Sequence, residues 1–187
     1  MIPHTLLLYL FLLLWLLPIT SSLAQRNVRN NVSVSSITYV LEHRIHTVYG
    51  VSRQANSVVE LNKNTQDIEA VRVTVPVKSF DSGNRTRDKS MLKTTDADKY
   101  PEVQFQSSSI HTNANQLEVT GLLNFHGITK PVSFKATKQQ TDKSLVITGS
   151  FEISLEEFGI KRPSVFGMKV RDTLSVRFQM VYPTTGT

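Results

Sequence analysis

Apolar and polar residues alternate along most of this chain. In residues 71–77 every second position is valine, and the positions between are Arg72, Thr74 and Pro76. A period of two is typical of a β-strand with one buried face, because successive side chains point to opposite sides of a sheet. The other segments with this pattern are residues 37–49, 57–62, 103–109, 117–125, 132–136, 145–153 and 174–182. The pattern therefore predicts about eight strands.

Short polar or glycine-containing breaks separate these segments. They fall at residues 81–84, 112–115, 126–127 and 142–143, and the last two are short enough to close β-hairpins. Only residues 86–98 lack the alternation and are rich in helix formers, so we expect a helix there with Asp88 as its N-cap. Many strands at close spacing predict a single all-β domain, an antiparallel sandwich or closed barrel with one or two short helical segments.

The most apolar part of the chain lies before this domain. Residues 6–17 are twelve consecutive apolar residues, followed by Pro18 and then by small residues up to Ala24. This arrangement is typical of a secretory signal peptide, and the apolar run is shorter than the roughly 20 residues that span a membrane. We therefore expect residues 1–24 to be removed, leaving an exported domain of residues 25–187, periplasmic or secreted, without a membrane span. The alternative is an uncleaved N-terminal anchor.

Composition excludes several classes of function. The 187 residues include no cysteine, which rules out disulfide scaffolds, cysteine-ligated metals and thiol nucleophiles. The formal net charge of +6 is spread along the chain without a basic run, so we expect no nucleic-acid partner; the alternatives are a solvated basic face and weak attraction to anionic lipid headgroups.

The sequence contains little that indicates a metal site or a catalytic site. His43 and His46 lie three residues apart, which on a strand directs the two rings to opposite faces, and no H-E-x-x-H pattern occurs. No G-x-S-x-G elbow or phosphate-binding loop is present, and the adjacent Glu156 and Glu157 do not face each other. We therefore expect no metal site, no cofactor and no enzymatic activity.

Three blocks of sequence carry a family resemblance. They lie in residues 80–105, 119–132 and 158–172, and include Phe80-Asp81-Ser82-Gly83-Asn84, His126-Gly127-Ile128 and Phe158-Gly159-Ile160. In this order and spacing they resemble the YceI-like family of exported polyisoprenoid-binding proteins. The resemblance implies an eight-stranded antiparallel, lipocalin-like barrel. It also implies a long amphiphilic ligand, such as a polyprenol or an isoprenoid quinone, and no chemistry performed by the protein. One departure is that Arg87-Asp88-Lys89 is followed by Ser90, where the family often has histidine.

Apolar and aromatic residues in or beside these blocks are the candidate ligand contacts. They are Phe80, Met91, Tyr100, Phe105, Phe125, Phe134 and Phe158. The alternative for each is ordinary core packing. For Arg87 we expect a pair with Asp88 or Asp172, or contact with a polar headgroup.

The leading hypothesis is thus an exported carrier or store for a lipid, acting as a monomer or homodimer, with a place in envelope stress or in quinone or polyprenol handling. One alternative is an enzyme acting on a bound lipid, with Arg87, Asp88 and Tyr100 as its polar groups. The other is a barrel with a filled interior whose loops bind another envelope protein. An apolar cavity, a wet polar pocket or a packed interior would distinguish the three.

Overall fold

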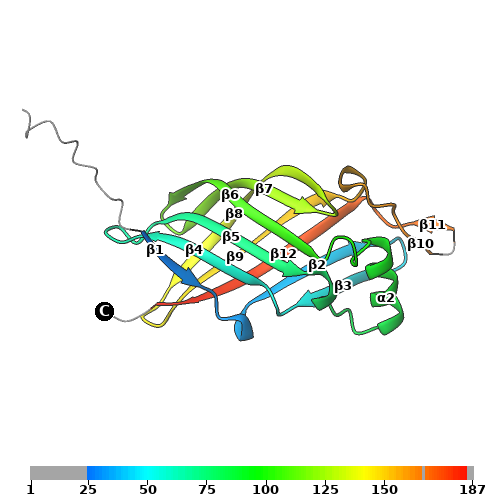
Figure 1. Cartoon of the computed structure of the whole chain (residues 1–187), viewed down its shortest axis with the longest axis horizontal. Helices are drawn as coiled ribbons and strands as arrows, with labels where there is room; N and C mark the ends of the chain where they lie inside the picture. The colour runs from blue at the N-terminus through cyan, green and yellow to red at the C-terminus, as the bar shows by residue number, and fades with distance from the viewer. Residues whose placement is uncertain (1–24, 166, 185–187) are drawn as a thin grey trace, which may run out of the picture.

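The computed structural model describes residues 25–165 and 167–184, so the predicted signal peptide of residues 1–24 lies outside the described residues. A sheet of ten antiparallel strands curls around a central space (Figure 1). Its strands are β1 (Gln25–Arg29), β2 (Ser36–Glu42), β3 (Thr47–Ser52), β4 (Asn56–Asn62), β5 (Ile68–Pro76), β6 (Glu102–Asn113), β7 (Gln116–Phe125), β8 (Ile128–Gln140), β9 (Ser144–Ser154) and β12 (Thr173–Pro183). Their order in the sheet is β1-β4-β5-β6-β7-β8-β9-β12-β2-β3.

Shorter elements fill the connections. The helix α2 (Arg85–Thr94) and the 3₁₀ turn η3 (Val77–Ser79) lie between β5 and β6. The 3₁₀ turn η4 (Glu156–Phe158) and the small hairpin of β10 (Ser164–Val165) and β11 (Met168–Lys169) lie between β9 and β12. A further 3₁₀ turn, η2 (Val32–Val34), follows β1. The prediction of an all-β barrel with short helical segments is confirmed.

The large sheet has two strands more than the predicted eight, for two reasons. Residues 37–49 form two strands, because the chain turns between them and the amide of His43 donates to the carbonyl of His46 at 2.9 Å. The additional edge strand β1 contains a single apolar residue, Val28, and therefore carries no alternating signal. It pairs with β4 through its backbone.

The expected N-cap of the helix was wrong. Asn84 caps α2, its side chain accepting from the amide of Arg87 at 3.0 Å. Asp88 lies inside the first turn, where its carboxylate accepts from both the amide and the hydroxyl of Ser82, at 3.1 and 2.5 Å. The helix also ends earlier than expected, at Thr94.

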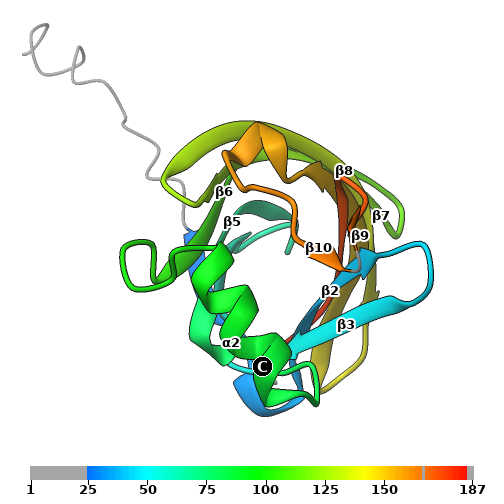
Figure 2. The same ribbon diagram turned by 90° about the vertical axis from the view of Figure 1, so that its right-hand side faces the viewer.

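The two ends of the barrel are built from different connections. The helix α2, the β2–β3 turn and the β10–β11 hairpin lie at the right-hand end in Figure 1 and face the viewer in Figure 2. We call this the helix end. The short β4–β5 and β8–β9 turns lie at the opposite end (Figure 1).

The end opposite the helix is closed by buried side chains. The ring of Tyr182 is 1% exposed, and its hydroxyl hydrogen-bonds to that of Ser57 of β4 at 2.6 Å. Burial raises the pKa of Tyr182 to about 12, with the Ser57 hydrogen bond acting in the opposite direction. Buried apolar residues of β4, β5, β7 and β9 pack in the same cluster, among them Val59, Ile68 and Leu117. We call this the closed end.

At the helix end two neighbouring strands separate. Hydrogen-bonded register between β8 and β9 covers only residues 136–140 and 145–149. Beyond it, Phe158 of η4 packs 5.8 Å from the ring of Phe125 and is 1% exposed. Asp172 holds this turn, accepting from the hydroxyl of Ser154 at 2.5 Å and from the amide of Glu156 at 2.9 Å. The hydroxyl of Ser154, followed by the Glu156 amide, holds the pKa of Asp172 below its usual range.

Candidate functional site: an apolar cavity with a polar mouth

A cavity of about 570 Å³ runs inside the barrel. This volume falls within the roughly 300–1,000 Å³ typical of small-molecule sites. The inward positions of β12 show its extent, because Leu174, Val176, Phe178, Met180 and Tyr182 all line it. At about 3.4 Å per residue these five positions span roughly 27 Å of strand. The alternation seen in the sequence is therefore the lining of an elongated cavity.

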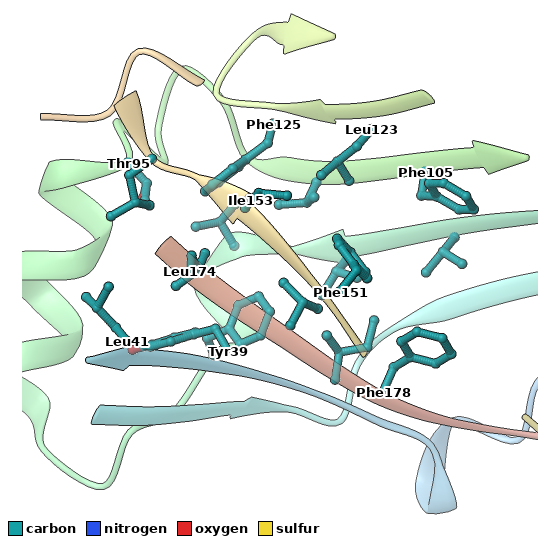
Figure 3. A pocket seen from close by; sticks show the side chains of 18 of the residues that line it. Tyr39, Leu41, Thr95, Phe105, Leu123, Phe125, Phe151, Ile153, Leu174 and Phe178 are labelled. Carbon is teal, nitrogen blue, oxygen red and sulfur yellow. The ribbon is translucent and has the colours of Figure 1, made fainter. Parts of the chain in front are cut away.

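Four aromatic rings form the middle of the cavity. The ring of Phe134 lies 5.5 Å from Phe105, 5.0 Å from Phe151 and 5.6 Å from Phe178, in tilted, stacked and edge-on arrangements. Glycine makes room for one of them, since a Cβ atom at Gly149 would lie 2.5 Å from the Phe178 ring. Figure 3 shows Phe105 and Phe178 farther from the helix than Leu41 and Thr95. The cluster gives the middle of the cavity an aromatic, uncharged wall.

Polar lining residues gather at the helix end. They come from the β2–β3 turn and from the region of α2, and they are His43, His46, Asn84, Thr86, Arg87, Ser90, Thr94 and Thr95. Across the described part of the chain, no aspartate or glutamate lines the cavity. The cavity therefore has an apolar body and a polar, cationic mouth.

Arg87 is fixed at this mouth by Ser82. Its Nε donates to the Ser82 hydroxyl oxygen at 2.8 Å and its Nη2 to the Ser82 carbonyl at 2.7 Å. The expected ion pair with Asp88 or Asp172 is not what holds Arg87 in the described structure: the Ser82 hydroxyl stands between Arg87 and Asp88. Burial raises the pKa of Tyr39 nearby, with Asp88 acting in the same direction and Arg87 opposing it. The guanidinium is thus oriented by a neutral partner.

His43 joins the two sides of the mouth. It is 6% exposed, its Nε2 lies 3.2 Å from the carbonyl oxygen of Met168, and its Nδ1 lies 3.4 Å from the amide of Ile45. The expectation that His43 and His46 diverge was wrong, because they flank a turn and their rings lie 5.2 Å apart. No cluster of three or more potential metal-ligating side chains occurs among the described residues. His43 links the β2–β3 turn to the β10–β11 hairpin.

The structure brings together most of the candidate contacts. Phe80, Met91, Phe105, Phe125 and Phe134 line the cavity. Tyr100 and Phe158 are not among its lining residues.

These two side chains have other neighbours. Tyr100 packs 4.7 Å from the ring of His126 and against Gly127, in the β7–β8 turn. Phe158 belongs to a buried cluster that also contains Phe125 and Leu155. Both lie within the sequence blocks of the resemblance, so position in these blocks did not separate them from the lining residues.

Several lining residues were not among the candidates. Phe151 and Phe178 occupy inward positions of correctly predicted strands, so the alternation alone could have found them. Tyr39 also lines the cavity, but the alternation predicts one continuous strand over residues 37–49, which obscures the position of Tyr39. The proposed catalytic set does not converge, because Tyr100 lies outside the lining while Arg87 and Asp88 are both bound to Ser82.

A family model described as a YceI-like domain matches residues 29–182. A UPF0312 protein of Pseudomonas putida strain GB-1 is 34% identical over 119 residues, which cover 58% of this chain and 62% of that protein. The protein YceI of Shigella flexneri is 31% identical over 94 residues, 48% of each chain. The matched regions thus span about half to three fifths of these curated relatives.

Solved structures share the fold. BcnA of Burkholderia cenocepacia superposes with a TM-score of 0.73 at 21% identity, covering 81% of this chain and 98% of that one. A polyisoprenoid-binding domain from Saccharophagus degradans, implicated in plant cell wall breakdown, gives a TM-score of 0.67 at 10% identity, covering 87% of this chain and 99% of that one.

Among the described residues, no helix is both long and apolar enough to cross a membrane.

Proposed function

This chain belongs to the YceI-like domain family, and we propose that it binds an amphiphilic lipid whose apolar tail fills the barrel. The observation that carries the proposal is the cavity of about 570 Å³, which is apolar along its length and has its charged and most of its polar lining groups at the helix end. An amphiphile matches this arrangement in one orientation, with its tail toward Tyr182 and its head beside Arg87. The protein would act as a carrier or store.

The ligand we propose is a long-chain isoprenoid, such as a polyprenol or an isoprenoid quinone. Its support is the shared fold with the polyisoprenoid-binding domain of Saccharophagus degradans. Burying each methylene contributes about 0.8 kcal/mol, so three five-carbon units contribute roughly 10 kcal/mol before the costs of association. Tail burial alone can therefore supply useful affinity. We propose no reaction, since Tyr100 lies outside the cavity lining and Arg87 and Asp88 are both bound to Ser82.

We also propose that the protein works after export. The apolar run of residues 6–17, followed by Pro18 and small residues up to Ala24, supports this. The intact mass of exported protein tests the point. We expect a chain beginning at Gln25, and a chain still beginning at Met1 would contradict cleavage.

Organic extraction of freshly purified protein, followed by mass spectrometry, tests lipid binding directly. We expect a lipid in stoichiometric amount. The matched variants are Val176→Trp, which places an indole in the cavity, and Arg177→Trp, which places it on the exposed face of the same strand. Val176→Trp should lower the bound lipid at least tenfold, on the order of 1.4 kcal/mol or more of binding free energy, whereas Arg177→Trp should leave it unchanged.

Thermal unfolding of both variants serves as the control for folding. An unchanged lipid content in folded Val176→Trp would show that the lipid does not occupy the cavity. Repeated extraction of wild-type protein without any lipid would contradict the proposed function itself.

A further inference from the structure

The outward face of α2 carries a row of cations. Arg85, Lys89 and Lys93 are spaced four residues apart, which places them above one another on one side of the helix, and all three are exposed. None of them forms an ion pair within the described residues. The side chains of Arg87, Met91 and Thr94 on the same helix line the cavity. The helix thus has one face toward the cavity and one cationic face toward solvent.

A second feature lies across the mouth, on the β2–β3 turn. Ile45 at this turn is 59% exposed, and its neighbour Arg44 is exposed as well. The β10–β11 hairpin supports this turn, because His43 is buried beneath the turn and its Nε2 contacts the Met168 carbonyl of the hairpin. An apolar side chain is therefore presented outward from a supported turn, beside a cation. Both elements face the viewer in Figure 2.

Most acidic side chains of the helix end already have a partner. They form the pairs Glu42–Arg171, Asp98–Lys78, Glu156–Arg162 and Glu157–Lys130, while Asp88 and Asp172 accept serine hydroxyls. The cations on α2 and on the β2–β3 turn are thus left available to an external anion.

From these features we infer that the helix end docks on an anionic phospholipid surface, with Ile45 entering the headgroup region and Arg44, Arg85, Lys89 and Lys93 contacting lipid phosphates. The inference rests on the proposed lipid-binding function, because docking places the cavity mouth against the bilayer. A tail can then pass between membrane and cavity without crossing water. An exposed apolar side chain flanked by cations fits this interface better than a polar acidic protein surface.

Each cation near an anionic surface strengthens binding by about fivefold, so the three on α2 together account for a factor on the order of a hundred at low salt. Added salt screens such contacts, since the Debye length falls from about 30 Å at 0.01 M to about 3 Å at 1 M ionic strength. Docking should therefore be reversible and salt-sensitive.

Sedimentation with vesicles tests the inference on the full chain. We compare vesicles of phosphatidylcholine alone with vesicles that also contain phosphatidylglycerol, at low and at high salt. The variants are Arg85→Gln/Lys89→Gln/Lys93→Gln and Ile45→Ser. The matched control is Arg29→Gln/Lys63→Gln/Lys143→Gln, which removes the same charge from exposed positions away from the helix end.

We expect wild-type protein to bind the anionic vesicles at low salt and to leave them at high salt. The α2 variant should lose at least tenfold in affinity and Ile45→Ser about threefold, with the control within twofold of wild type. Equal losses in the α2 variant and the control would overturn the inference, because they indicate a net-charge effect. Undiminished binding by the α2 variant, or no wild-type binding, would overturn it as well.

Lipid extraction on the same samples separates this inference from the proposed function. If the protein contains lipid but does not bind anionic vesicles, the docking inference is wrong and the lipid-binding proposal stands. A protein that docks but carries no lipid refutes lipid binding alone. Should the α2 variant instead lose capture by an immobilised acidic protein while vesicle binding is unchanged, the surface is a protein interface and membrane docking is wrong.

Discussion

The two ends of this barrel differ, although the same strands run through both. The closed end is buried, and its central polar contact joins two neutral hydroxyls, those of Tyr182 and Ser57, at 2.6 Å. The helix end is partly exposed and held by hydrogen bonds to charged groups, such as those between Arg87 and Ser82 and between Ser154 and Asp172. The cavity therefore has a direction, because the two hydroxyls at the closed end are paired with each other while the charged and most of the polar lining groups lie at the helix end.

The connections, rather than the strands, create this difference. At the closed end β6 and β7 are joined through residues 114–115 and β8 and β9 through residues 141–143. At the helix end the chain takes residues 77–101 to pass from β5 to β6 and residues 155–172 to pass from β9 to β12. Long connections on a rigid scaffold are where binding residues concentrate. A substitution at one end should therefore leave the other end intact.

Removing the side chain that closes the barrel should have the largest effect. Tyr182→Ala leaves a cavity beneath the closed end and an unpaired Ser57 hydroxyl, so we expect it to lower the free energy of unfolding by about 3–5 kcal/mol. Urea denaturation measures this value. Tyr49, which is 51% exposed, provides the matched control, and Tyr49→Ala should stay within about 0.5 kcal/mol of wild type. Equal losses in the two variants would show that Tyr182 does not close the barrel.

Alkaline pH should also destabilise the closed end, because it favours ionisation of Tyr182. The pKa of Tyr182 is about 12 in the folded protein against an ordinary value of 10.0, so folding favours the protonated hydroxyl. The resulting stability is fully present below pH 10 and is lost as pH rises from about 10 to about 12. At about 1.4 kcal/mol per pH unit the loss amounts to roughly 2–3 kcal/mol.

Denaturation midpoints between pH 9 and pH 12, measured on wild type and Tyr182→Phe, follow this loss. The variant is less stable at pH 9 but should show a flatter decline, because its buried ring cannot ionise. Parallel declines in the two proteins would mean that another group is responsible.

At the helix end, His43→Leu should have a smaller and more local effect. The variant removes the partner of the Met168 carbonyl, a loss of about 1 kcal/mol. Hydrogen exchange should quicken in residues 43–46 and 167–169 while the closed end keeps its protection. His111→Leu, at an exposed position of β6, is the control. Unchanged exchange in both segments would refute the link between the turn and the hairpin.

Asp172→Asn should have the smallest effect, confined to the pH dependence of stability. The pKa of Asp172 is held below its ordinary value of 3.8 by the Ser154 hydroxyl first and the Glu156 amide second. Its contribution is present above that ordinary value and is lost as pH falls through the folded value. Melting curves between about pH 2 and pH 5 should therefore fall less steeply with acid in the variant than in wild type. An equally steep fall would contradict the assignment.

The sequence predicted the closed end better than the helix end. Alternation located β12 with Tyr182 at an inward position, because a period of two follows directly from strand geometry. It missed that residues 43–46 are a turn, that Asn84 rather than Asp88 caps α2, and that Ser82 holds Arg87. These features depend on contacts between loops that are distant in the sequence. The periodicity of a single segment carries no information about such contacts. Phe158 illustrates the same point, since an aromatic side chain fits a cavity-lining position and a buried core position equally well.

Photo-crosslinking of a bound isoprenoid tests most directly whether the cavity holds a lipid in one direction. One probe carries a diazirine at the end of its tail and a second carries it beside the headgroup, and the crosslinked peptides of full-chain protein are mapped by mass spectrometry. We predict that the tail probe labels peptides containing Leu117, Met180 or Tyr182, and that the headgroup probe labels α2 or the β2–β3 turn. Labelling of the same peptides by both probes, or labelling confined to outward-facing residues, would contradict the account.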